Sequence, residues 1–213
     1  MSTPSEPPIT AAIADPAPLG LGAFALTTFL LSVANAGLMK NGTGDAWLGY
    51  ALAYGGLGQL LAGMWEFRNR NVFGATAFST YGGFWIGLAL WVILVAGKQP
   101  SGSPAVGKDI AWILLAFAIF NTYMLIWSTQ LNMAVFGVFL TLELTEIVLF
   151  VGGFAGNTSI IKVGGYIGIL TALVAWYTSA AGVISGMSGR AVLPVGRALY
   201  DMSSRPAITR ERV

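Results

Sequence analysis

The sequence predicts an all-α integral membrane protein with six transmembrane helices in each protomer. Three observations support this fold class. Of the 213 residues, 55% are hydrophobic and only 9% are charged, whereas a soluble domain has about 25% charged residues. Six apolar runs are each long enough to cross about 30 Å of hydrocarbon. The polar segments between them are short, so no soluble domain fits between the runs.

The six runs cover residues 18–39, 46–67, 74–96, 110–129, 133–155 and 160–188. None alternates as transmembrane β-strands do, and their glycines and alanines favour close helix packing. The first 14 residues are rich in Pro, Ser and Thr and lack the basic and apolar regions of a signal peptide. We therefore expect a disordered tail (1–14), a six-helix transmembrane domain (15–196) and a basic cytoplasmic tail (197–213).

Basic residues orient the predicted helices. Seven arginines follow the second and sixth runs, and four lysines lie in the opposite set of connections. Cytoplasmic segments have the excess of Lys and Arg, so we predict that both termini are cytoplasmic in a multi-pass protein of the plasma membrane. The arginines are Arg68, Arg70, Arg190, Arg197, Arg205, Arg210 and Arg212, and the lysines are Lys40, Lys98, Lys108 and Lys162.

The composition excludes several function classes. The chain has no histidine and no cysteine, which removes disulfide scaffolds, zinc sites, haem ligation and Ser-His or Cys-His nucleophiles. The chain is also too apolar for a nucleic-acid-binding protein. We expect no enzyme activity, no metal, no cofactor and no nucleic-acid partner.

The start of the first run has the pattern of a helix N-terminus. Asp15 is a good N-cap and Pro16 a good first helical residue. A helix start also offers free backbone N–H groups and the positive end of the helix dipole to an anion. Asp15 itself would repel a carboxylate, so the backbone that follows is the better candidate for contact with an anion. That backbone includes Leu19, Gly20 and Leu21.

Polar side chains form stripes along the first two runs, and lipid cannot satisfy them, so they must face protein or water. In the first run both interhelical hydrogen bonding and pore lining are open. In the second run Gln59 either donates two hydrogen bonds to a carboxylate or fixes a neighbouring helix, and Glu66 is expected to form an interfacial ion pair with nearby arginines. The stripes are Phe24, Thr27, Thr28, Leu31 and Asn35, and Gly55, Gln59, Ala62 and Glu66.

The remaining runs have polar faces of different kinds. Hydroxyl groups in the third run can replace water around a carboxylate, and Asn71 stands where an N-cap would. Polar residues in the fourth run favour a packing seam, and those of the sixth suit a narrow lining. These sets are Thr76, Ser79, Thr80 and Tyr81; Asn121, Thr122, Ser128 and Thr129; and Thr171, Ala175, Thr178 and Gly182.

Four segments resemble one known family. Residues 15–28 are DPAPLGLGAFALTT, 59–67 are QLLAGMWEF, 71–85 are NVFGATAFSTYGGFW, and 189–196 are GRAVLPVG. Together they resemble the acetate uptake transporters, also called succinate–acetate transporters, over about residues 15–196. The chain departs from the family pattern at Asp15, where the family usually has Asn.

This resemblance implies a fold, an assembly and a substrate. It implies a six-span protomer with its own pore, assembled into a hexamer that resembles proton-gated urea channels. It also implies passage of acetate, and of succinate in some members, usually with proton coupling. The family's pore constriction is a Phe, a Tyr and a Leu. These correspond by motif to Phe24 and Tyr81, and by counting back from residues 155–157 to Leu142.

The fifth run contains two acids, Glu143 and Glu146, which the family pattern does not require. Intramembrane carboxylates are rare and usually functional. A helix places Glu146 about 40° around the axis from Leu142, and Glu143 about 100°. If Leu142 lines the pore, Glu146 lies near the same face, and Glu143 turns toward a neighbouring helix or subunit. We hypothesise a proton-responsive role, above all for Glu146; hydrogen bonding across a subunit interface is the alternative.

The resulting functional hypothesis is a transporter or channel for a small monocarboxylate. No Arg or Lys lies in the core of any run, so we expect weak binding that suits conduction rather than a tight carboxylate clamp. Transport of ammonia or ammonium is the alternative within transport, since the two acids suit a cation. A non-transporting membrane scaffold is the alternative from a different class.

Overall fold

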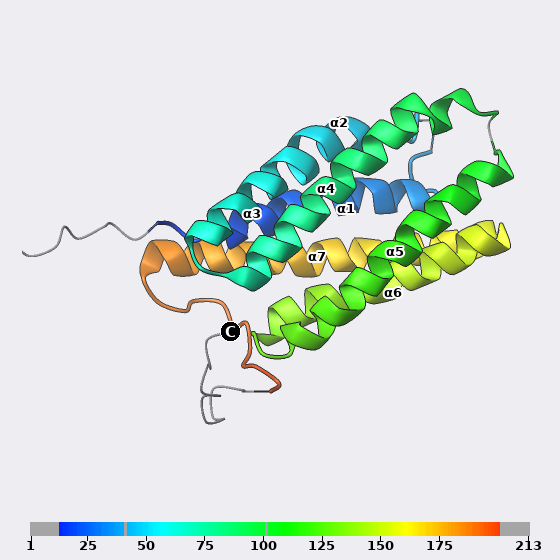
Figure 1. The fold of residues 1–213 in the computed structure, drawn as a ribbon. Coiled ribbons are helices and arrows are strands. Elements are labelled where there is room, and N and C mark those ends of the chain that lie inside the picture. The colour runs from blue at the N-terminus through cyan, green and yellow to red at the C-terminus, as the bar shows by residue number, and fades with distance from the viewer. Residues whose placement is uncertain (1–12, 41, 101, 201–213) are drawn as a thin grey trace, which may run out of the picture.

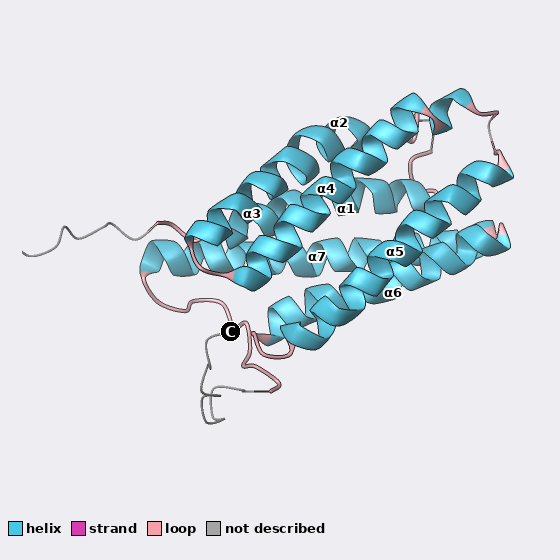
Figure 2. Ribbon diagram, in the orientation of Figure 1, coloured by secondary structure: helices cyan, strands magenta, loops and turns pink. Residues whose placement is uncertain are grey.

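The computed structural model describes residues 13–40, 42–100 and 102–200, and within them every regular element is a helix (Figure 2). The α-helices are joined by short connections, and one π-helical and one 3-10 segment accompany them. The elements are α1 (Ala17–Asn35), α2 (Trp47–Leu52), η1 (Ala53–Gly58), α3 (Gln59–Arg68), α4 (Val72–Leu94), η2 (Ala96–Lys98), α5 (Pro104–Ser128), α6 (Met133–Ala155) and α7 (Thr158–Ser188).

Five described helices are long and apolar enough to cross a membrane: α1, α4 extended to Lys98, α5, α6 and α7. The predicted second run is also helical from Trp47 to Arg68, although its backbone changes from α to π and back to α. The all-helical, multi-pass fold class is therefore confirmed at this level.

Helix boundaries follow local capping more closely than hydropathy. The Asn71 side chain accepts a hydrogen bond from the Gly74 N–H at 3.0 Å, as an N-cap does. The prediction was wrong at the start of the fourth run, because α5 begins at Pro104 and not at residue 110. Proline suits the first helical turn, so the helix begins in a polar segment before the apolar run.

The π-helical segment η1 keeps one face of the second run buried. Trp47 and Ala51 before it, and Gln59, Ala62 and Glu66 after it, are all buried. In an ideal α-helix, side chains four residues apart are displaced around the axis, so a stripe with that spacing leaves one face. A π-helical turn holds an extra residue and brings the stripe back to the same face. The predicted stripe from Gly55 to Glu66 therefore faces the protein interior along its whole length.

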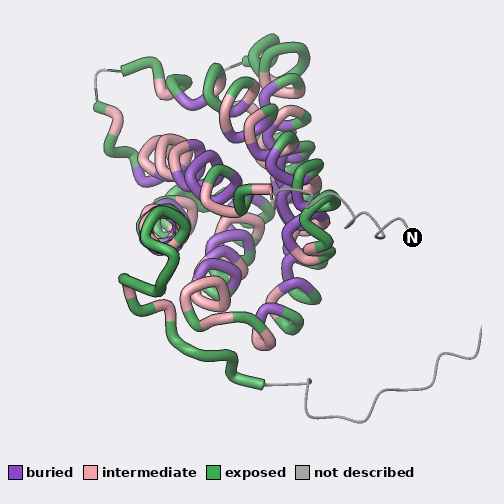
Figure 3. The backbone as a smooth tube through the Cα atoms, turned by 90° about the vertical axis from the view of Figure 1, so that its left-hand side faces the viewer, coloured by how far each residue is buried: buried purple, intermediate pink, exposed green. Residues whose placement is uncertain are grey.

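The helices pack as neighbouring pairs around the bundle, and side chains fill its centre. α1 packs on α7, α7 on α6, α6 on α5, and α3 on α4, whereas α4 and α5 make few close backbone contacts among the described residues. Buried stretches lie on the inner sides of the helices and exposed stretches around the outside (Figure 3). The helices thus surround an interior that α1, α4 and α6 all face.

α2, η1 and α3 form one continuous run, and the runs alternate in direction along the chain, so the start of α1 and the end of α7 lie at the same end of the bundle (Figure 1). The segment after α7 crosses that end and bonds to the α5–α6 connection and to the first turn of α6. Val195 O accepts from the Ala134 N–H at 2.9 Å, and Thr129 O accepts from the Leu199 N–H at 2.8 Å. We call residues 194–200 the C-terminal strap.

The close approach of α4 to the second run predicts a position-specific effect on stability. A Cβ atom at Gly82 would lie 2.7 Å from the Leu60 backbone nitrogen, whereas one at Gly186 would meet nothing within 4 Å. Overpacking of this kind costs about 1–3 kcal/mol, so Gly82→Ala should lower the midpoint of thermal unfolding in detergent by about 2–10 °C. Gly186→Ala is the control, and an equal midpoint for both variants would contradict the prediction.

Candidate functional site

Two small cavities inside the bundle share one wall. The Gln59 cavity is about 20 Å³ and the Glu146 cavity about 40 Å³, which is room for one to a few water-sized groups. Tyr81 lines both. The Gln59 cavity is otherwise lined by Leu21, Phe24, Gln59, Ala77, Phe78, Val138 and Phe139. The Glu146 cavity is otherwise lined by Thr28, Leu31, Ser32, Asn35, Phe84, Trp85, Leu114, Leu142, Thr145, Glu146 and Leu149.

The two cavities follow one another along α1, and Tyr81 stands between them. Phe24 lines the cavity nearer the start of α1, and its ring meets the Tyr81 ring edge-on at a centroid distance of 5.8 Å. Leu142 lines the cavity on the other side of Tyr81. All three side chains are buried. The residues predicted to form a constriction therefore lie around the wall between the cavities.

The Tyr81 hydroxyl begins a chain of hydrogen bonds from α4 to α5 and α6. It donates to Asn121 Oδ1 at 3.0 Å and lies 3.4 Å from Glu146 Oε1. The Asn121 amide nitrogen donates to Phe139 O at 3.0 Å and to Glu143 Oε2 at 2.7 Å. All the hydrogen-bonding capacity of Asn121 Nδ2 is thereby used. We call Glu146, Tyr81, Asn121 and Glu143 the polar chain.

The two acids of α6 occupy different places in the polar chain. Glu146 is 3% exposed and lines the Glu146 cavity. Glu143 is half-buried, and its other carboxylate oxygen accepts from the Thr122 hydroxyl at 2.8 Å, at the outer side of α5. Glu146 thus lies near the face of Leu142, and Glu143 turns toward the neighbouring helix, as their helical spacing indicates.

Several buried polar atoms near the cavities have no hydrogen-bond partner within the described protein. Three of them, Thr28 Oγ1, Trp85 Nε1 and Glu146 Oε2, belong to side chains that line the Glu146 cavity. Gln59 Oε1 is also unpaired, and its side chain lines the other cavity. A buried polar group without a partner is costly, so their grouping around two small cavities indicates places where a polar ligand or water would bind.

Other residues with predicted pathway roles lie around the cavities or away from them. Leu21, Thr28, Asn35 and Gln59 line one of the two cavities. Gly20 packs against the Phe78 ring, and Thr27 packs against Gly55. Thr178 is buried and its hydroxyl donates to Val174 O at 2.8 Å. Neither cavity has Leu19, Thr27, Thr80, Ala175 or Thr178 in its lining.

Two functional candidates were not found by sequence reasoning. Asn121 was assigned to a packing seam, but it is fully buried and holds the centre of the polar chain. Its only sequence signal is an amide in the middle of an apolar run. Trp85 is the last residue of a family motif, and nothing in its spacing indicates that its side chain lines a cavity with the indole N–H unpaired.

The start of α1 offers few free backbone donors. The Asp15 carboxylate accepts from the Ala17 N–H at 2.9 Å. Pro16 and Pro18 have no N–H, and the Gly20 N–H donates to Pro16 O at 3.2 Å. In the first turn of α1, the Leu19 N–H is therefore the backbone donor that these hydrogen bonds leave available to an anion. The Leu19 side chain is half-exposed.

Glu66 lies at the same end of the bundle and is fully buried. Its described hydrogen bond comes from the Asn69 side-chain amide at 3.1 Å. The expected ion pair with Arg68 or Arg70 was therefore wrong for the described residues. The carboxyl group turns inward against Gly74 at the start of α4, where a Cβ atom would lie 2.8 Å from Glu66 Oε1.

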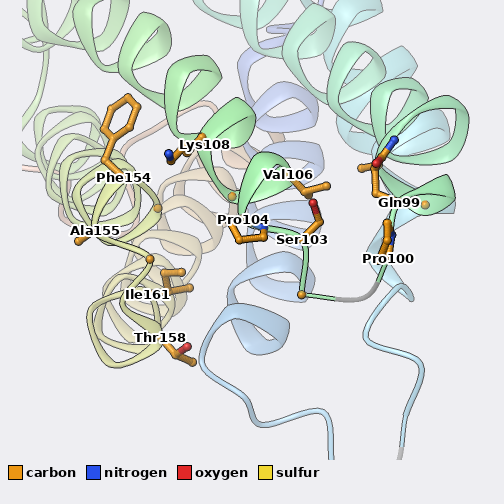
Figure 4. A pocket seen from close by; sticks show the side chains of 16 residues that line it. Gln99, Pro100, Ser103, Pro104, Val106, Lys108, Phe154, Ala155, Thr158 and Ile161 are labelled. Atoms are coloured by element: carbon orange, nitrogen blue, oxygen red, sulfur yellow. The ribbon is translucent and has the colours of Figure 1, made fainter.

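A much larger depression of about 740 Å³ lies at the opposite end of the bundle. It is formed where the α4–α5 connection meets the α6–α7 connection, with Pro100, Ser103, Lys108 and Thr158 around it (Figure 4). It is lined by these connections and by the adjoining ends of α5, α6 and α7, and none of the polar chain lines it. We therefore place the candidate site at the two inner cavities.

Comparison with known proteins gives a consistent result. The GPR1/FUN34/yaaH family matches residues 1–196. The chain is 40% identical to Acetate permease A of Emericella nidulans, over 90% of this chain and 69% of that protein. It is 34% identical to the Succinate-acetate/proton symporter SatP of Escherichia coli, over 86% of this chain and 96% of that protein.

The fold also matches a solved structure. The structure of the bacterial acetate channel SatP superposes with a TM-score of 0.79 at 32% sequence identity, covering 86% of this chain and 99% of that one. The names of these relatives describe transporters and channels, not enzymes.

The polar chain predicts that Asn121 stabilises the bundle. Asn121→Leu would remove the hydrogen bonds that Asn121 forms with the Tyr81 hydroxyl, Phe139 O and Glu143, at about 0.5–1.5 kcal/mol for each lost bond. We expect the thermal unfolding midpoint in detergent to fall by at least about 5 °C. Thr122→Val, which removes one bond at the exposed rim, should lower it much less; equal losses would show that Asn121 has no special role.

Proposed function

Because the chain belongs to the GPR1/FUN34/yaaH family, we propose that it is a membrane transporter or channel for acetate and other small carboxylates, with no catalytic role. The observation that supports this most is the pair of cavities on either side of Tyr81. Their walls combine apolar side chains with a few unpaired polar atoms, which suits an ion with a methyl group and a carboxylate. No Lys or Arg lines either cavity, so binding there would be weak enough for release.

The proposed pathway runs along the inner face of α1. Leu19, Gly20 and Leu21 would form its entrance, Phe24, Tyr81 and Leu142 its constriction, and hydroxyl and amide groups its polar lining. The position of Tyr81 between the two cavities supports the constriction. The proposed lining comprises Thr27, Thr28, Asn35, Gln59, Thr80, Ala175 and Thr178, of which Thr28, Asn35 and Gln59 have the support of lining a cavity.

We further propose six spans with both termini in the cytoplasm of a plasma-membrane protein that resembles urea channels. The second run supports six spans because it is continuously helical over residues 47–68. The shared end of α1 and α7 supports termini on one side. Glu143 is half-buried in the middle of α6 and bonds to the exposed Thr122 on α5. Lipid cannot satisfy such polar groups, and this supports a homo-oligomer, proposed as a hexamer.

Proton coupling is proposed to act through the acids of α6. A charged, unpaired carboxylate is strongly disfavoured at a buried site, so Glu146 would be neutral when an acid passes. The polar chain supports this role because it connects Glu146 to Glu143 through Tyr81 and Asn121. The same two carboxylates favour a second candidate function, the passage of ammonium or ammonia.

Uptake of labelled acetate into proteoliposomes tests the proposed function. We expect uptake above that of protein-free liposomes, and faster uptake when the outside is more acidic, because a proton would accompany the anion. Labelled methylammonium, measured in the same vesicles, tests the ammonium alternative. Uptake of neither compound above the protein-free level would support a scaffold and would overturn the proposal.

The constriction can be tested without breaking the polar chain. Phe24→Ala with Leu142→Ala removes two of the three constricting side chains and leaves the Tyr81 hydroxyl in place. We expect succinate uptake relative to acetate uptake to rise several-fold, because the wider opening admits a larger ion. Leu144→Ala on the exposed side of α6 is the control, and an unchanged ratio in the double variant would remove these residues from the constriction.

A further inference from the structure

We propose that the Glu146 cavity is a binding site for one carboxyl group of a short monocarboxylic acid, which accepts hydrogen bonds from Trp85 and Thr28 and shares one proton with Glu146. This inference rests on the proposed function and identifies the substrate class and the groups that would recognise it. It adds Trp85 to the site and gives Glu146 direct contact with the substrate.

The observation behind this inference is a set of three unpaired polar atoms around one cavity. Trp85 Nε1 comes from α4, Thr28 Oγ1 from α1 and Glu146 Oε2 from α6. Their side chains are 3%, 5% and 3% exposed, respectively, and all three line the Glu146 cavity. Three different helices therefore bring side chains with unpaired hydrogen-bonding atoms to one cavity.

The chemistry of the three atoms is complementary to a carboxyl group. The indole N–H can only donate, and the threonine hydroxyl can donate once, so both can bond to oxygens of a carboxylate. The third atom, Glu146 Oε2, is itself a carboxyl oxygen. Two carboxylates only accept hydrogen bonds, so Glu146 and the substrate can bond to each other only when one of them carries a proton. That proton lies either on Glu146 or on the substrate, and the pair has a net charge of −1 in both cases.

The surroundings allow this shared proton. The titratable groups near Glu146 are Tyr81 on α4, whose hydroxyl lies 3.4 Å from Glu146 Oε1, and Glu143, one turn earlier on α6. α1 contributes hydroxyls to the cavity instead, those of Thr28 and Ser32. Glu143 is held by donors from Asn121 and Thr122. No basic group lines the cavity, so a second negative charge there would be uncompensated.

The size and walls of the cavity select the substrate. Its volume is about 40 Å³. Its walls are largely apolar, with Leu31, Phe84, Leu114 and Leu142 among them, and the polar side chains of Ser32, Asn35 and Thr145 also line it. A substrate with one carboxyl group and a short hydrocarbon chain would match this lining, because the hydrocarbon chain would contact the apolar side chains. A dicarboxylate would bring a second negative charge into a cavity that no Lys or Arg lines, and an uncompensated buried charge is strongly unfavourable.

Binding measurements can test the donors. Equilibrium dialysis of labelled acetate against the detergent-solubilised full chain gives a dissociation constant. Trp85→Phe removes the indole N–H and keeps an aromatic ring, and loss of one hydrogen bond to a charged group should raise that constant about tenfold. Trp176→Phe, which alters a ring packed on Phe29 away from the cavity, is the matched control. Equal constants for both variants would overturn the role of Trp85.

The shared proton predicts the pH dependence of binding. If one proton binds together with each acetate, binding weakens once Glu146 is ionised in the free protein. In that pH range the dissociation constant for acetate rises by up to about tenfold for each pH unit. Glu146→Gln always offers an N–H donor, so its constant should change less than about twofold between pH 5.5 and 7.5. Glu66→Gln, a buried acid outside the cavity, should keep the wild-type profile. A wild-type profile in Glu146→Gln would overturn the shared proton.

Competition identifies the substrate class. Butyrate should displace labelled acetate at concentrations within about tenfold of acetate itself, whereas succinate at neutral pH should not. Equal competition by succinate would overturn the single-carboxyl site. Acetate uptake that persists while these binding tests fail would leave the proposed function intact and reject only this site, whereas loss of uptake by the wild-type chain would reject both.

Discussion

The hydrogen bond from Tyr81 to Asn121 joins two sets of helices that otherwise make few close backbone contacts across the interior. Within the apolar layer of a membrane no water is present to bond to a polar group, so each hydrogen-bond donor needs an acceptor inside the protein. Asn121 meets this constraint by bonding to α4 and α6 at once. The rings of Phe117 and Phe120 on α5 also pack against Tyr81, so side chains rather than close backbones join α4 to α5 across the interior.

Much of the fold could be predicted from the sequence because hydropathy reports where a chain is apolar. The fifth run coincides with α6 from Met133 to Ala155, and Asn71 begins α4 as a cap. The early start at Pro104 was missed, since a helix can extend into polar sequence once a proline begins it. The π-helical segment of residues 53–58 was missed as well, because an i→i+5 hydrogen-bond pattern has no composition of its own.

The candidate site was less predictable, because helical spacing gives a direction around one helix but not the partner it meets. The angle between Leu142 and Glu146 indicated one shared face, and both line the same cavity. The spacing of Thr27 equally suggested that face, yet its side chain packs on Gly55. Asn121 and Trp85 were passed over since their roles depend on which helices lie opposite, and only the tertiary arrangement gives that.

The C-terminal strap has a consequence for how this chain can be handled. Backbone N–H groups as late as Leu199 and Tyr200 bond to Thr129, and Pro194 O accepts from the Tyr177 hydroxyl at 2.6 Å. The last helix therefore does not mark the end of the folded unit. A reporter or purification tag joined directly after Ser188 would displace the segment that holds the α5–α6 connection, whereas one joined beyond Tyr200 would leave it in place.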